Sequence, residues 1–219
     1  MRLQHIPLLA LATINFIDVA TSVRTMIPNT CFDSQANFDT DWANFYPWGT
    51  DHNGAARMNA ARIALSNKSL LLTAVPVTGQ PPASSGGKSI PIHYLSGTVH
   101  AKEQFTVQKT GGYDFSAEFL ATTTVGTWPA FWLTAVNGWP PEIDLAEWKG
   151  SGKISFNTFN TSSVVAAKDV TYSSPASWHT VKVECRESGG TDVKCVFYLN
   201  GAVVTTQYGK GFVGKAMWL

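Results

Sequence analysis

The chain consists largely of short apolar runs that alternate with turn residues, and this pattern restricts the folds open to it. Gly, Pro, Asn and Ser separate the runs, and none of them shows the 3.6-residue period of a convincing amphipathic helix. The runs lie at 69–77, 95–108, 113–124, 129–134, 142–148, 153–160, 179–186, 193–199 and 202–207. Many short strands without interleaved helices predict an all-β domain, a β-sandwich or jelly roll.

The composition favours a polysaccharide-binding domain over a nucleic-acid-binding one. Lys and Arg number 16 against 15 Asp and Glu among 219 residues, so the chain has no basic excess for phosphates. Aromatic residues make up 12% of the chain, with 8 Trp, and the turn-rich segment 31–56 contains several of them. A tryptophan ring offers a flat apolar face to a pyranose.

We expect one domain, residues 23–219, that acts as a monomer.

Both ends of the chain have distinctive patterns. Residues 1–22 combine Arg2, an apolar stretch of about twelve residues and small residues, which is typical of a secretory signal peptide. A membrane span would need about 20 apolar residues. We therefore expect a secreted, extracellular protein without a membrane span. The chain stops at Trp218-Leu219 within an apolar run, which predicts a domain truncated at its C-terminus, lacking a closing strand and prone to aggregate.

Two sequons and a cysteine pair agree with secretion. Asn67 and Asn160 each begin an Asn-X-Ser/Thr sequon for N-glycosylation. Cys185 and Cys195 lie symmetrically about a Gly-Gly turn. They could face each other across a hairpin and form a disulfide, or remain two buried thiols. Cys31 has no predicted partner.

The candidate chemistry lies in three acids within six residues. On a regular strand Glu142 and Asp144 share one face, whereas Glu147 would point into the core, where an unpaired carboxylate is costly. One extra residue in a bulge at Leu145-Ala146 would return Glu147 to the acid face. Close carboxyls cannot all ionise easily, so they could supply the ionised nucleophile and protonated acid of glycoside cleavage. The alternatives are a solvated acidic strand and a calcium site, although calcium usually takes oxygens from a flexible loop.

This segment and the strand before it resemble glycoside hydrolase family 16, the laminarinase-like β-glucanases. The motifs that carry the resemblance are WPAFWL at 128–133 and EIDLAE at 142–147, with further similarity at 94–99 and 178–201. The similarity extends from about Trp42 to the end of the chain. It implies a β-jelly roll of two curved antiparallel sheets with an open, concave glycan-binding cleft.

By position in this motif, Glu142 matches the nucleophile, Glu147 the acid/base, and Asp144 the residue that hydrogen-bonds the nucleophile and tunes its charge. The implied activity is cleavage of a β-linked polysaccharide, a β-1,3- or β-1,3/1,4-glucan, by retaining double displacement without cofactor or metal. The sequence departs from the family pattern at two places. Pro141 stands where the family often has Gly, and residues 157–159 lack the His of the Thr-x-His that the family often has after the acids. The specificity therefore does not follow from the motif.

Other functions on the same fold remain alternatives to a hydrolase. A non-catalytic, lectin-like glycan-binding module would keep the fold without the chemistry, and a transglycosylase acting on cell-wall glycan would share the first chemical step. A polysaccharide lyase is less favoured, because no cluster of basic residues and tyrosines accompanies the acids.

Three tryptophans are candidates for stacking on sugars. Trp128 and Trp132 share one parity on the strand before the acids, so both could face the cleft, although burial in the core is an equal alternative. Trp139 precedes the acids in a loop and is expected at the rim. Trp148 has the opposite parity to Glu147 and is expected in the core. His179 opens an apolar strand, where a structural role is expected.

Overall fold

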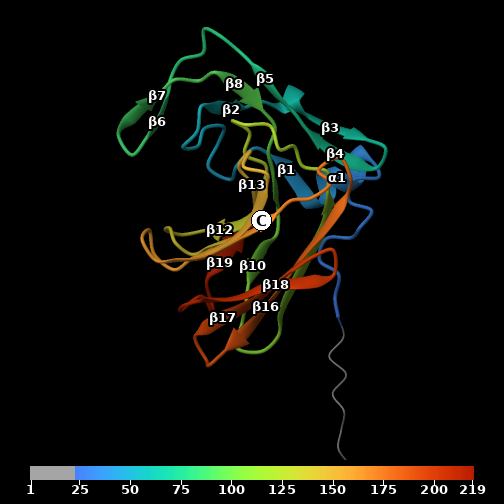
Figure 1. Ribbon diagram of the computed structural model, residues 1–219, viewed down its shortest axis with the longest axis vertical. Coiled ribbons are helices and arrows are strands. Elements are labelled where there is room, and N and C mark those ends of the chain that lie inside the picture. The colour runs from blue at the N-terminus through green and yellow to red at the C-terminus, as the bar shows by residue number, and fades with distance from the viewer. Residues whose placement is uncertain (1–22) are drawn as a thin grey trace, which may run out of the picture.

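Two main antiparallel sheets build the protein, whose computed structural model describes residues 23–219 (Figure 1). The predicted signal peptide, 1–22, lies outside the described residues. The six-stranded sheet has the order β10 (Gln104–Thr106), β19 (Ala216–Trp218), β12 (Ala130–Ala135), β13 (Glu142–Trp148), β14 (Lys153–Phe159), β15 (Val165–Thr171). The four-stranded sheet has the order β11 (Gly112–Phe119), β16 (His179–Ser188), β17 (Asp192–Leu199), β18 (Ala202–Gly209).

Smaller sheets from the N-terminal half gather at the top of the view, away from β16, β17 and β18 (Figure 1). A three-stranded sheet joins β2 (Ala56–Met58), β8 (Tyr94–Ser96) and β5 (Ala74–Pro76), and β1 (Trp42–Asn44) pairs with β9 (Val99–Ala101). Two hairpins pair β3 (Ile63–Ser66) with β4 (Ser69–Leu72) and β6 (Ala83–Ser85) with β7 (Lys88–Ile90). The single strand expected at 69–77 is therefore divided between β4 and β5.

The core lies between the two main sheets, as the alternation of apolar residues requires. On β16, Val181 and Val183 are fully buried, and on β17 Phe197 is fully buried. Phe156 of β14 meets Phe197 edge-on, with ring centroids 5.8 Å apart. These residues belong to one continuous apolar cluster. The predicted all-β jelly-roll sandwich is confirmed.

No amphipathic helix was expected, and the described residues contain only two short helical segments. The helix α1 (Gln35–Asp41) follows Ser34, whose side chain accepts a hydrogen bond from the Asn37 amide at 3.1 Å, and a 3-10 turn, η1, covers Ala60–Arg62. Within α1 only Phe38 is buried, so the segment is too short to display an amphipathic period. No helix among residues 23–219 has the length and apolarity to cross a membrane.

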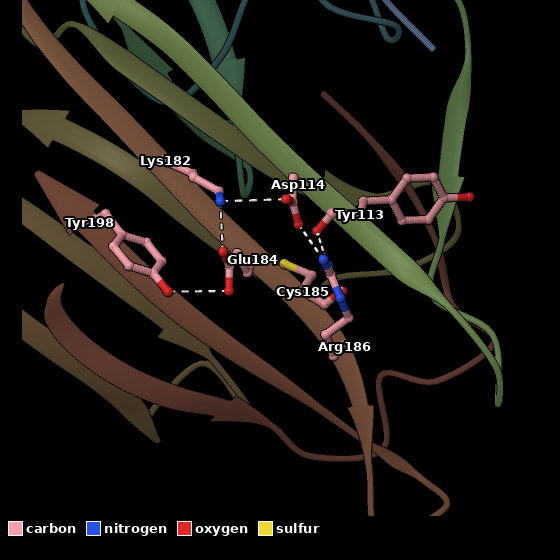
Figure 2. A network of polar contacts seen from close by, with 7 residues as sticks. All are labelled: Tyr113, Asp114, Lys182, Glu184, Cys185, Arg186 and Tyr198. Carbon is pink, nitrogen blue, oxygen red and sulfur yellow. Dashed lines mark hydrogen bonds and ion pairs between the residues drawn. The ribbon is translucent and has the colours of Figure 1, made fainter. Parts of the chain in front are cut away.

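The outer face of the four-stranded sheet carries a network of charged side chains (Figure 2). On β16, Lys182, Glu184 and Arg186 alternate with buried residues. Lys182 contacts Glu184 at 2.6 Å and Asp114 of β11 at 3.4 Å. Arg186 also pairs with Asp114, and the Tyr198 hydroxyl donates to Glu184 at 3.1 Å. Because exposed ion pairs add little stability, this network mainly keeps the outer face solvated.

The final apolar run of the chain is an interior strand. Met217 of β19 pairs with Phe105 of β10 on one side and with Ala135 of β12 on the other. Its side chain is buried in the core. The apolar character of this run is thus explained by its position between two strands, and truncation of the domain stays a prediction.

The two sequons lie in different settings. Asn67 is exposed in the turn between β3 and β4, in the left-handed conformation with φ 49°. Asn160 follows β14, and its side chain donates to the Tyr208 carbonyl at 3.2 Å and accepts from the Lys210 amide at 2.6 Å. Glycosylation of both residues stays a prediction.

Cys185 and Cys195 face each other across β16 and β17. They are direct register partners, both are fully buried, and their Sγ atoms lie 3.6 Å apart as thiols. The hydrogen bond with Cys185, together with burial, raises the pKa of the Cys195 thiol. Because the thiolate is the reactive form, we expect any disulfide to form during folding rather than afterwards.

We expect this disulfide to raise the free energy of unfolding by about 2.5–3 kcal/mol, the value for closing a loop of about ten residues. Peptide mass spectrometry without reduction would detect the linked peptides, and urea unfolding with and without reductant would measure the stabilisation. The double variant Cys185→Ala/Cys195→Ala serves as the control, since its midpoint should not respond to reductant. An unchanged midpoint for the reduced native sequence would contradict the prediction.

Candidate active site

The three acids lie on one face of β13 because the strand contains the predicted bulge. Along β12, Ala130, Trp132 and Thr134 share one face, and their partners on β13 are Glu147, Asp144 and Glu142 respectively. The register shifts between Phe131 and Trp132, so Leu145 is the extra residue. The pairing with β14 is interrupted at the same place, between Asp144 and Glu147. The bulge therefore turns Glu147 to the side of the other two acids.

Side-chain donors hold each carboxylate in place. Asn157 lies opposite Asp144 on β14, and its Nδ2 donates to Asp144 Oδ2 and to Glu147 Oε2, both at 2.8 Å. The Trp128 indole Nε1 donates to Glu147 Oε1 at 2.7 Å. The Trp139 indole Nε1 donates to Glu142 Oε2 at 2.8 Å. The loops before β12 and β13 thus each supply one tryptophan that orients one glutamate.

A lysine completes the surroundings of Glu147. Lys149, which directly follows β13, places its Nζ 2.9 Å from Glu147 Oε2 and 5.0 Å from the centre of the Trp128 ring. Glu147 consequently has three donors on its two oxygens, two of them from neutral side chains. Such an arrangement fixes the orientation of this carboxylate.

Burial and mutual repulsion distribute the protons among the acids. Burial, followed by the charges of Glu147 and Glu142, raises the pKa of Asp144 to about 9. Burial also raises the pKa of Glu142, a rise that the Trp139 hydrogen bond opposes. Asp144 is only 2% exposed and is therefore neutral at pH 7. The neutral carboxyl of the site is therefore Asp144, which lies between the two glutamates, whereas the sequence predicted the proton on the general acid.

An aromatic cluster adjoins Trp132. The segment 45–52 brings Tyr46, Trp48 and His52 against it, with ring centroids 5.9–6.5 Å from the Trp132 ring. Tyr46 and Trp48 stack at 5.0 Å with an interplanar angle of 3°. Burial lowers the pKa of His52, which favours a neutral imidazole. Trp48 is 48% exposed and so offers a flat apolar surface beside the acid strand.

The predicted tryptophans therefore all lie at the site, with different roles. Trp132 is partly covered by the aromatic cluster, whereas Trp128 and Trp139 are exposed and bind the glutamates through their indole N–H groups. Trp148 is in the core, as expected. His179 is buried and bonded to the Ser174 carbonyl, in agreement with a structural role.

Sequence reasoning missed Asn157, Lys149, Tyr46, Trp48 and His52 as site residues. Asn157 could have been found, because pairing the acid strand with the next strand of the chain places this polar residue opposite Asp144. The other four reach the site through tertiary contacts, which no local sequence pattern predicts. Within residues 23–219 no group of three or more His, Cys, Asp and Glu is arranged to hold a metal ion.

Comparison with known proteins identifies a relative that aligns with nearly the whole chain. No protein-family model matches it. The chain is 51% identical over 214 residues to a galactan endo-β-1,3-galactanase of Flammulina velutipes, an alignment that covers 97% of this chain and 83% of that protein. A shorter match to the endo-1,3-1,4-β-glycanase ExsH of Rhizobium meliloti is 33% identical over 88 residues, 40% of this chain and 17% of that protein.

Solved structures share the fold at low sequence identity. Porphyranase B from Zobellia galactanivorans matches with a TM-score of 0.60 and 16% identity, over 82% of this chain and 73% of that one. A Bacillus licheniformis β-glucanase matches with a TM-score of 0.57 and 16% identity, over 81% and 77%. With a galactanase relative 51% identical over 97% of this chain, and a jelly roll shared with these glycanases, the chain is a glycosidase and belongs to glycoside hydrolase family 16.

Proposed function

We propose that this protein is a secreted endo-glycosidase that cleaves β-1,3-linked galactan with retention of anomeric configuration. The observation that carries the proposal is the cluster of three carboxyl groups on β13. A bulge aligns Glu142, Asp144 and Glu147, and side-chain N–H donors orient each of them. Secretion is supported by the signal-peptide pattern at 1–22. Galactan is favoured over the expected β-glucan because the relative that covers most of the chain is a galactanase.

In the first step Glu142 attacks the anomeric carbon while Glu147 donates its proton to the departing glycosidic oxygen. This step forms a glycosyl ester on Glu142 and breaks the glycosidic bond. Trp139 orients the nucleophile, and Trp128 with Asn157 orients the acid. Neutral Asp144 adds no charge beside the attacking carboxylate.

In the second step a water molecule replaces the leaving sugar. Glu147, now ionised, removes a proton from this water, and the oxygen attacks the anomeric carbon and releases Glu142. Two inversions give a product of the original β configuration. Trp128 and Asn157 keep the Glu147 carboxylate oriented for this base step.

The aromatic cluster suits a galactose residue. The axial hydroxyl at C4 leaves the opposite face of galactose rich in C–H groups, and such a face stacks well on an indole ring. The exposed ring of Trp48 is therefore proposed as a sugar-stacking surface next to the acids.

The test is a panel of β-1,3-galactan, laminarin, mixed-linkage glucan, xyloglucan and agarose. We expect oligosaccharides from β-1,3-galactan, and proton NMR during the reaction should show the β-anomer first. Cleavage of laminarin without cleavage of galactan would overturn the substrate, and initial α-anomer would overturn retention. Binding without release would indicate the lectin-like alternative, and products longer than the substrate would indicate the transglycosylase.

Trp48→Ala is expected to raise KM for galactan about tenfold and to change kcat by less than about threefold, because a lost stacking contact costs ~1.4 kcal/mol of binding. Steady-state kinetics on galactan would measure both constants. Tyr208→Ala is the control, since Tyr208 is an exposed aromatic on β18 of the four-stranded sheet. Equal KM values for the Trp48 and Tyr208 variants would contradict the stacking role.

A further inference from the structure

Lys149 is a charged residue at the site that the two chemical steps do not use. Its ammonium lies between the Glu147 carboxylate, at 2.9 Å, and the face of the Trp128 ring, at 5.0 Å. Trp128 closes the triangle, because its indole N–H donates to the other oxygen of Glu147 at 2.7 Å. The Lys149 side chain is 37% exposed and that of Glu147 is 11% exposed. The ion pair thus joins a long, flexible side chain, Lys149, to a largely buried acid, Glu147.

The charges around the site make this lysine distinctive. Glu142, Asp144 and Glu147 are three acids on one strand face. Among the described residues, Lys149 is the cation that forms an ion pair within this group, with Glu147. The partners of Glu142 on the flanking strands, Thr134 and Phe159, carry no charge. Asn157, which bridges two of the acids, is neutral as well.

We propose that Lys149 is a positioning residue: its ammonium holds the Glu147 carboxylate against Trp128 and offsets the negative charge of the two glutamates, Glu142 and Glu147. The inference rests on the catalytic roles proposed above for Glu142 and Glu147. As acid, Glu147 must carry a proton on one oxygen, so one of its three donors has to withdraw. Lys149 is the donor with the long, flexible side chain, and the Trp128 face can retain its ammonium meanwhile.

The nucleophile should respond to this charge as well. Burial raises the pKa of Glu142, the charge of Glu147 raises it further, and the charge of Lys149 lowers it. The reaction needs ionised Glu142, which sets the acid limb of the pH profile. Removing the lysine charge therefore raises the pKa of Glu142 and moves the acid limb to higher pH.

The experiment compares Lys149→Met, Lys149→Gln and Lys149→Arg with Lys194→Met, which removes an exposed lysine from β17 of the other sheet. The pH profile of kcat/KM is measured on whichever glycan of the panel the native protein cleaves. We expect the Met and Gln variants to shift the acid limb to higher pH by about 0.5–1 pH unit. At a given pH on that limb, kcat/KM should then fall ~3–10-fold. Arg and the control should keep the native profile. The proposal would be overturned if Lys149→Met and Lys149→Gln kept the native pH profile, or if the profile of Lys149→Arg shifted as far as that of Lys149→Met.

A second readout needs no substrate. The carboxyl ¹³C resonance of Glu142, identified by its loss in Glu142→Gln, is titrated in the native protein and the lysine variants. A higher midpoint in Lys149→Met, restored in Lys149→Arg, supports the charge effect even if no glycan is cleaved, and that result would count against the proposed function alone. An active enzyme whose Glu142 midpoint is the same in all variants would overturn the role of Lys149 alone.

Discussion

Glu142→Gln is expected to lower kcat on the polysaccharide about 10⁴-fold or more, the scale seen when a catalytic nucleophile is removed. The amide cannot form the glycosyl ester, yet it keeps the size of the side chain and can still bond to the Trp139 indole through its carbonyl oxygen. Binding of galactan should therefore change little. Turnover assays and binding calorimetry would measure the two effects separately.

Matched variants make this result specific. Glu118→Gln, on an exposed position of β11, should keep native activity. Glu142→Ala with added azide should recover cleavage, because a small anion can occupy the vacated space, and the product should be the α-glycosyl azide from a single inversion. A Glu142→Gln variant with more than a tenth of native kcat would show that another group is the nucleophile.

The free energy of unfolding is expected to fall as the pH rises from about 4 toward 9, by up to ~1.4 kcal/mol per pH unit from one residue. That residue is Asp144, whose pKa the fold raises from 3.8 to about 9, through burial first and then the charges of Glu147 and Glu142. Between these values the folded protein holds a proton that the unfolded chain has released. The stabilisation is therefore complete below the unfolded pKa and is lost as the pH approaches the folded one.

Asp144→Asn should remove this pH dependence. An amide is neutral at every pH, and it offers both the acceptor that Asn157 needs and a donor for Glu147. Urea unfolding at several pH values would compare this variant with the native protein and with Asp114→Asn, a replacement on the outer face of the other sheet. If the native and Asp144→Asn stabilities change in parallel between pH 5 and 8, Asp144 is ionised in the folded state and the prediction is wrong.

Local alternation was enough to predict much of this fold. Trp148 and the acids could be assigned to opposite faces because side chains alternate along a strand, and the core position of Trp148 is confirmed. The bulge could be predicted from the free-energy cost of burying a charge, because a regular strand would have buried the Glu147 carboxylate without a partner. The opposition of Cys185 and Cys195 could be predicted because a hairpin turn relates neighbouring strands by simple symmetry.

Only the tertiary structure decided what surrounds the acids. Trp48 and His52 meet Trp132 across some eighty residues of chain, and no periodicity in segment 45–52 specifies that contact. Lys149 lies beyond the end of β13, where alternation no longer predicts direction, so its pairing with Glu147 depends on the path of the loop. The sequence thus determined which face of β13 carries the acids, because that follows from backbone geometry. The proton on Asp144 depends on burial and on charges brought together by folding, which no linear pattern contains.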